Sequence, residues 1–181
     1  MTREAWLRGP VEGVPAALMP AAHSLMDALE EIEAAVSGLD TQALWVRPGG
    51  AASIGFHLRH AGGSIRRLLT YARGEALDPG QLAAIKREAE PGTPPAGVEE
   101  LLHGLRDAIE LAMRTYRQTD PETLDEPRKV GRAGLPSSTR GLLFHLADHT
   151  RRHAGQVVTT AKIVRGLDLT DAPDAERPRG A

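Results

Sequence analysis

The sequence predicts an all-α protein built as a four-helix bundle. Proline and glycine divide the chain into long blocks, and within each block the apolar residues recur every three or four positions rather than alternately. Aromatic residues make up only 3% of the 181 residues, so a core must be built from Leu, Ala, Val and Ile, which is more typical of helix packing than of a β-sandwich. The connectors between the blocks differ in length, as they do in many helical bundles.

The first half of the chain contains two of the predicted helices. The first covers residues 20–37, and a connector rich in turn-forming residues follows it. Ser53 is a suitable N-cap for the second helix, and Gly74 is expected to end it. The apolar stripe of this second helix consists of Ile54, Leu58, Ala61, Ile65, Leu68 and Ala72.

The second half supplies the other two helices. A proline-rich connection over residues 78–97 leaves room for one short helix, and the third long helix covers residues 98–119. Residues 128–138 allow a short extended piece. Ser138 is then positioned to cap the fourth helix, which we predict over residues 139–165.

Composition restricts the classes of function. The net charge of -2 provides no strong field that would attract nucleic acid or an anionic membrane. The absence of cysteine excludes disulfides, thiolate zinc sites and a cysteine nucleophile. Because the sequence shows neither a signal peptide nor an apolar run long enough to span a bilayer, we expect a cytoplasmic protein. Residues 1–166 are expected to form a single domain and residues 167–181 a loosely ordered tail.

The stretch HLADHTRRHAGQ, residues 145–156, places three histidines at four-residue intervals, which brings them to one side of a helix. His149 and His153 continue the apolar stripe of the fourth helix, whereas His145 lies about 50° outside it and is expected to be a supporting or surface residue. An unpaired buried polar group costs about 1–3 kcal/mol, so two buried histidines need partners. One metal ion would satisfy both rings; the alternative is that they lie at the stripe's edge and bond water or carboxylates. The stripe consists of Leu142, Leu146, His149, His153, Val157, Thr160 and Val164.

A metal site needs a third ligand, and the second helix offers His57 and His60. On a helical wheel His57 lies about 60° from the centre of the apolar stripe and His60 about 120° from it on the same side. Periodicity therefore favours His57, but only slightly, because a bundle helix touches two neighbours. On the fourth helix, Asp148 and Gln156 are candidates for supporting roles.

Other chemistry-bearing residues predict little. His23 and His103 have no clustered partners, so we expect surface or capping roles for them. The carboxylates of REAE, residues 87–90, and EELL, residues 99–102, are expected to lie on solvated helix faces. No serine-hydrolase elbow, phosphate-binding loop or zinc-protease motif is present, and no glutamate adjoins a histidine of the fourth helix. No catalytic residue is therefore assigned.

Two segments resemble a known family. ASIGFHLRHAGGSIRRLLTY, residues 52–71, is similar to a segment in which a Ser-Ile pair is followed by a ligand histidine, here His60. HLADHTRRHAGQVV resembles the signature His-x-x-x-His-x-Gly-Gln, which implies His149 and His153 as the other ligands. Both are features of the DinB-like superfamily, small four-helix bundles described as metal-dependent hydrolases. The likeness extends over most of residues 15–166, with one departure at Ala154, where many members carry arginine.

The resemblance implies a DinB-like bundle with a long connection between its second and third helices. It also implies a divalent metal, often zinc or nickel, and a homodimer. Since some relatives transfer low-molecular-weight thiols, such a thiol is an expected cosubstrate. We therefore expect a metal-dependent enzyme that acts on a small molecule by hydrolysis or thiol transfer. The alternative is a non-catalytic, dimeric metal-binding module; neither a nucleic acid nor a membrane is an expected partner.

Overall fold

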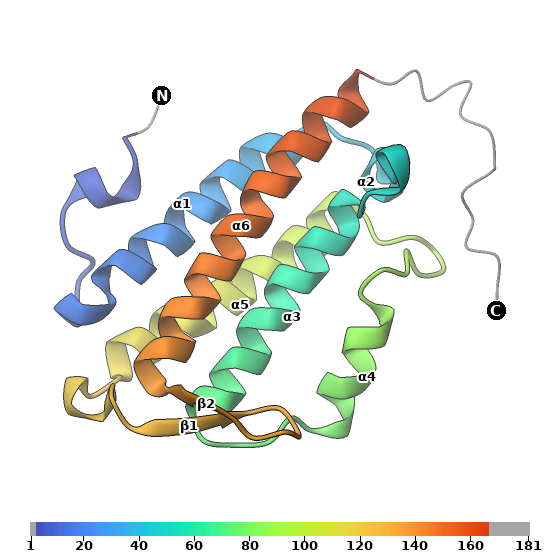
Figure 1. The fold of residues 1–181 in the computed structure, drawn as a ribbon. Helices are drawn as coiled ribbons and strands as arrows, with labels where there is room; N and C mark the ends of the chain where they lie inside the picture. Colours follow the sequence, from blue (N-terminus) through green and yellow to red (C-terminus); the bar gives the residue numbers. More distant parts are fainter. Residues whose placement is uncertain (1–2, 167–181) are drawn as a thin grey trace.

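Four long helices form a bundle around one core in the computed structural model, which describes residues 3–166 (Figure 1). Around the bundle, α1 packs against α6, α6 against α3, α3 against α5, and α5 against α1. The predicted four-helix bundle is confirmed. The four helices are α1 (Met19–Val36), α3 (Ile54–Ala72), α5 (Val98–Gln118) and α6 (Thr139–Arg165).

Side chains at the helix ends explain why these helices begin where they do. The hydroxyl of Ser53 accepts a hydrogen bond from the backbone N–H of Phe56 at 3.2 Å, at the start of α3. The hydroxyl of Ser138 accepts one from the N–H of Gly141 at 3.1 Å, at the start of α6. Each bond satisfies a backbone donor that the first turn of a helix leaves free. Both predicted N-caps are therefore confirmed, and α6 covers the predicted residues.

The connection between α3 and α5 contains the short helix α4 (Pro79–Arg87), which Figure 1 shows beside α3. Asp78 and Gln81 form a reciprocal capping box at its start. The side chain of Gln81 also donates to the hydroxyl of Thr70 on α3 at 2.9 Å, which ties α4 to the bundle. The shorter elements are η1 (Ala5–Arg8), η2 (Ala16–Leu18), α2 (Thr41–Trp45), η3 (Pro48–Gly50) and η4 (Pro121–Thr123).

A small hairpin precedes α6 and adds to the bundle that the sequence predicts. Strands β1 (Pro127–Val130) and β2 (Leu135–Ser138) pair antiparallel, and their turn contains Gly131 and Gly134 at positive φ. Residues 128–138, where the sequence allows a short extended piece, thus lie within this hairpin. Because Ser138 ends β2 and caps α6, the hairpin leads directly into the helix that carries two of the candidate ligands.

The apolar stripes predicted for the helices form the core, with one correction. On α3, Leu69 is buried whereas Leu68 is only partly buried, because α3 packs against both α5 and α6 and buries a wider face than a single stripe. No helix within residues 3–166 combines the length and apolar character needed to cross a membrane. The tail predicted for residues 167–181 lies outside the described residues.

Candidate metal centre

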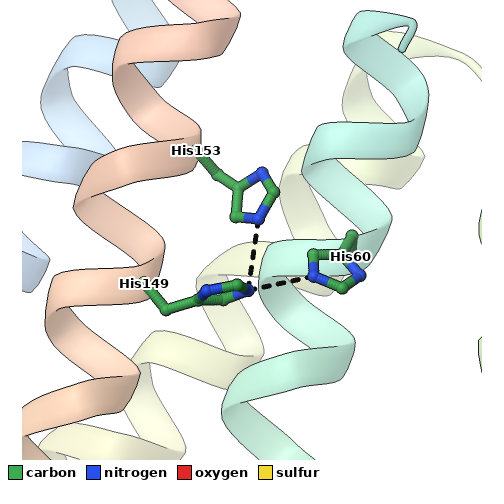
Figure 2. Close-up of side chains that lie close together, drawn as sticks. All are labelled: His60, His149 and His153. Atoms are coloured by element: carbon green, nitrogen blue, oxygen red, sulfur yellow. Dashed lines mark hydrogen bonds between the residues drawn. The ribbon is translucent and has the colours of Figure 1, made fainter.

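Three histidines from two neighbouring helices meet inside the bundle. His60 lies on α3, and His149 and His153 lie one turn apart on α6, so that all three rings converge between the helices (Figure 2). The Nε2 atom of His149 lies 2.9 Å from Nε2 of His60 and 3.2 Å from Nε2 of His153. One nitrogen from each ring lies within 4.8 Å of the others.

These separations fit the coordination of one metal ion. Because zinc–nitrogen bonds are about 2.0–2.1 Å long, two nitrogens on one tetrahedral ion lie roughly 3.3 Å apart. The distances from Nε2 of His149 to Nε2 of His60 and to Nε2 of His153, 2.9 Å and 3.2 Å, are close to that value. A neutral imidazole has only one N–H, so three Nε2 atoms that face one another satisfy each other poorly by hydrogen bonding alone. The donor set of His60, His149 and His153 therefore fits a divalent cation.

The ring of His60 is held from its other side by Glu88, which directly follows α4. Nδ1 of His60 donates to a carboxylate oxygen of Glu88 at 2.7 Å, and Arg67 donates to the other oxygen at 2.6 Å. A proton on Nδ1 leaves the Nε2 atom of His60 with a free lone pair, which is the form that binds a metal. Burial by itself would raise the pKa of Glu88, but the hydrogen bonds from His60 and Arg67 outweigh it and bring that pKa below its ordinary value.

The burial of Glu88 corrects the prediction for REAE. Glu88 is only 6% exposed, whereas Glu90 in the same stretch is exposed, as are Glu99 and Glu100 of EELL. The expectation of a solvated helix face was wrong for Glu88 because α4 ends at Arg87 and the next residue turns back onto α3. Helical periodicity carries no information about such a turn.

His57, the competing candidate for the third ligand, contacts the cluster on the side of His153 that faces away from His149. It is 6% exposed, and its Nδ1 atom lies 3.0 Å from Nδ1 of His153. If Nε2 of His153 faces a metal, its Nδ1–H donates to Nδ1 of His57, which accepts. The structure therefore brings His60, and not His57, to the face shared with His149.

A model of the DinB superfamily matches residues 24–157 of the chain, a range that includes all of these histidines. The chain belongs to the DinB superfamily. Its fold is also similar to that of a conserved protein from Enterococcus faecalis, with a TM-score of 0.67 and 18% sequence identity over 83% of this chain and 98% of the other. At that identity the likeness concerns the fold alone. A comparison with curated proteins finds no match.

Three other polar residues of the DinB signature face solvent, and they are His145, Asp148 and Gln156. His145 is exposed, as predicted for a surface residue, and its ring centroid lies 5.6 Å from that of His149. Asp148 is exposed and forms an ion pair with Arg152 at 3.1 Å. Gln156 is exposed as well. The supporting roles considered for Asp148 and Gln156 therefore pass to Glu88 and to His57.

The two isolated histidines differ from one another. His103 is exposed and lies 3.3 Å from Asp107, as expected for a surface residue. His23 is buried, and its Nε2 donates to the carbonyl of Gly9 at 3.0 Å. Of the surface or capping roles expected for His23, the surface role was wrong because the segment before α1 folds back over that helix and covers the ring.

Burial favours the neutral form of three of the clustered histidines, His57, His149 and His153. Desolvation, with a smaller contribution from neighbouring positive charge, lowers the pKa of His57 and that of His149 to about 4. The same causes lower the pKa of His153 to about 3. Metal ions bind the neutral imidazole, so His149 and His153 of this DinB centre are in the binding-competent form at neutral pH.

These shifts predict that the metal-free protein loses stability as the pH falls below about 6.5. The unfolded histidines take up protons near that pH, whereas His57, His149 and His153 in the folded protein do so only near pH 3–4. The unfolded state thus binds more protons between these values. From pH 7 to pH 5 we expect a loss of about 2–4 kcal/mol in the free energy of unfolding. This value is smaller than the sum of the contributions that the three pKa shifts imply, because solvent screens the partly exposed rings.

Urea denaturation of chelator-treated protein across that pH range measures the loss. A variant with both His149→Ala and His153→Ala should show a shallower pH dependence, since two of the shifted groups are gone. Identical slopes for the variant and the wild type would contradict the assignment of the loss to this cluster.

A cleft of about 370 Å³ lies next to the centre, between α3 and the end of α4. Glu88, in its lining, contacts His60 through its carboxylate. The side chain of His60 is itself 24% exposed and His149 is partly buried, so solvent reaches the cluster directly. The cleft is lined by Arg59, Gly63, Ala84, Arg87, Glu88, Glu90 and Gly92.

Proposed function

We propose that this chain is a divalent-metal-dependent enzyme that acts on a small molecule at His60, His149 and His153. The observation that carries the proposal is the convergence of three Nε2 atoms, one from each histidine. The rings of His149 and His153 are neutral at pH 7. The hydrogen bond from Nδ1 of His60 to Glu88 fixes the tautomer of the third ring. A zinc or nickel ion held by three neutral imidazoles retains its full charge and has open positions, and it lowers the pKa of a bound water or thiol.

The protein groups around the histidines favour thiol transfer over hydrolysis. Within residues 3–166, Glu88 is the carboxylate that contacts the cluster, and both of its oxygens already accept hydrogen bonds. Asp148 faces solvent and pairs with Arg152. Neither of these two carboxylates is thus free to take a proton from an attacking water. A thiol needs less help, because its pKa of about 8.5 lies far below that of water.

The other candidate function is a non-catalytic module that binds metal and dimerises. Its dimer contact would cover apolar side chains that α6 leaves in solvent near its two ends: Phe144 is 58% exposed and Ile163 is 47% exposed. A second copy of the chain would cover such residues. In this case the metal would stabilise the bundle without turning over a substrate.

Turnover by metal-loaded protein separates the two functions. We expect the wild type to accelerate the reaction of low-molecular-weight thiols with electrophiles, and the double variant His149→Ala, His153→Ala to be about 100-fold or more slower, since it lacks two ligands. A panel of simple esters and amides tests hydrolysis in parallel. Wild-type rates equal to those of the double variant across both panels, with metal bound to the wild type, would favour the module.

A further inference from the structure

We infer that Glu88 is a positioning residue of the metal centre, which orients His60 and is itself held by Arg67 in space that Gly63 leaves open. The inference rests on the proposed metal site, and it adds a segment from the connection between α3 and α5 to that site. The carboxylate does not face the space between the three Nε2 atoms; it binds the opposite nitrogen of His60. It therefore acts on the metal through His60.

Burial and geometry make this contact specific. The side chains of Glu88 and Arg67 are 7% and 11% exposed, and their N–O separation is 2.6 Å. A buried carboxylate is costly unless its oxygens are bonded, and here one oxygen takes the guanidinium and the other the imidazole N–H. With both oxygens engaged, Glu88 is suited to hold a proton on Nδ1 of His60 rather than to accept one from a substrate.

A glycine in the middle of α3 provides the room that the ion pair occupies. A Cβ atom at Gly63 would lie 2.7 Å from a carboxylate oxygen of Glu88 and 2.8 Å from a guanidinium nitrogen of Arg67. Glycine weakens a helix interior relative to alanine, so its presence there calls for a local reason. Because both clashing atoms end flexible side chains, an added methyl group should displace the ion pair rather than the helix.

A purely structural role for Glu88, as an anchor of α4, makes a different prediction. The connection has anchors that do not involve Glu88: Gln81 donates to Thr70, and Arg59 donates to the carbonyl of Pro91 at 3.2 Å. The fold should therefore survive the loss of the carboxylate. A positioning role lowers metal affinity and changes the His60 ring, whereas an anchoring role lowers only the melting temperature.

Glu88→Gln, compared with Glu90→Gln, tests the positioning role. Both substitutions remove one negative charge from the same cleft, but the side chain of Glu90 is exposed. Competition with a chromophoric chelator measures zinc affinity, and we expect about a 10- to 100-fold loss for Glu88→Gln and wild-type affinity for Glu90→Gln. In ¹⁵N NMR spectra of the metal-free protein, the protonated Nδ1 signal of His60 should be altered only in Glu88→Gln.

Gly63→Ala, compared with Gly104→Ala, provides a second test that removes no polar group from the chain. A Cβ at Gly104, on α5, meets no atom within 4 Å. We expect both variants to keep the helical circular dichroism of the wild type, and only Gly63→Ala to bind zinc more weakly. This pair decides the question by itself if Glu88→Gln does not fold.

The outcomes separate this inference from the proposed function. Zinc affinity in Glu88→Gln and Gly63→Ala equal to that of a zinc-binding wild type would overturn the positioning role and leave the proposed function standing. Wild-type protein that binds no zinc would overturn both. Weaker binding in the two variants, with their controls unchanged, would establish Glu88 as part of the centre.

Discussion

Replacing His149 and His153 together by alanine is expected to abolish tight binding of divalent metal and the stabilisation that comes with it. The change removes two of the three nitrogens that converge between α3 and α6 and leaves His60 alone. A ligand present at about 1,000 times its dissociation constant stabilises a folded protein by about 4 kcal/mol. Zinc or nickel should therefore raise the melting temperature of the wild type and leave that of the double variant unchanged.

Elemental analysis of both purified proteins measures the bound metal, and thermal unfolding with and without added metal measures the stabilisation. His145→Ala is the matched control, because His145 occupies the preceding four-residue position on α6 but is exposed. It should bind metal as the wild type does. Equal, near-zero metal content in wild type and double variant, after metal has been supplied, would refute the site.

Most of the fold is predictable because it depends on short-range patterns. A helix is marked by apolar residues every three or four positions and by a capping side chain, and both lie within a few residues of one another. The last helix shows this well: Ser138 and the apolar stripe after it predict the observed bounds of α6, Thr139–Arg165. The hairpin before it is harder to predict, because pairing of β1 with β2 depends on the turn between them.

The choice between His57 and His60 shows the limit of periodicity. His57 is the more buried of the two, as the helical wheel predicts, yet it lies against the Nδ1 atom of His153, behind the face where His149 and His60 meet. Side chains are buried on two sides of α3 because the helix packs against both α5 and α6. A single apolar stripe does not show which buried side of α3 faces α6. The choice of His60 therefore depends on the family resemblance.

Glu88 was beyond the reach of sequence patterns for a different reason. It contacts His60 across 28 residues, through a connection whose path no local repeat determines. One signal was nevertheless present: the pair Gly62-Gly63 in the middle of a helix marks a close approach. In the structure Gly62 lies against the backbone of α5, and Gly63 makes room for Glu88.

Substituting Ala154 by arginine, the residue that many DinB members are expected to carry there, should strongly destabilise this chain. Ala154 follows His153 on α6 and is 0% exposed, so an arginine would have to overpack the core and bury an unpaired charge. We expect the free energy of unfolding to fall by about 3–5 kcal/mol, which is among the largest effects of single substitutions.

Gln156→Arg adds the same side chain and charge two residues further along α6, at an exposed position, and should change stability by less than about 0.5 kcal/mol. Urea denaturation of both metal-free variants gives the comparison without any contribution from bound metal. If Ala154→Arg were as stable as Gln156→Arg, the packing of α6 around Ala154 would have to be looser than the structure has it. A large difference would mean that the core of this chain requires a small apolar side chain at position 154, directly after the candidate ligand His153.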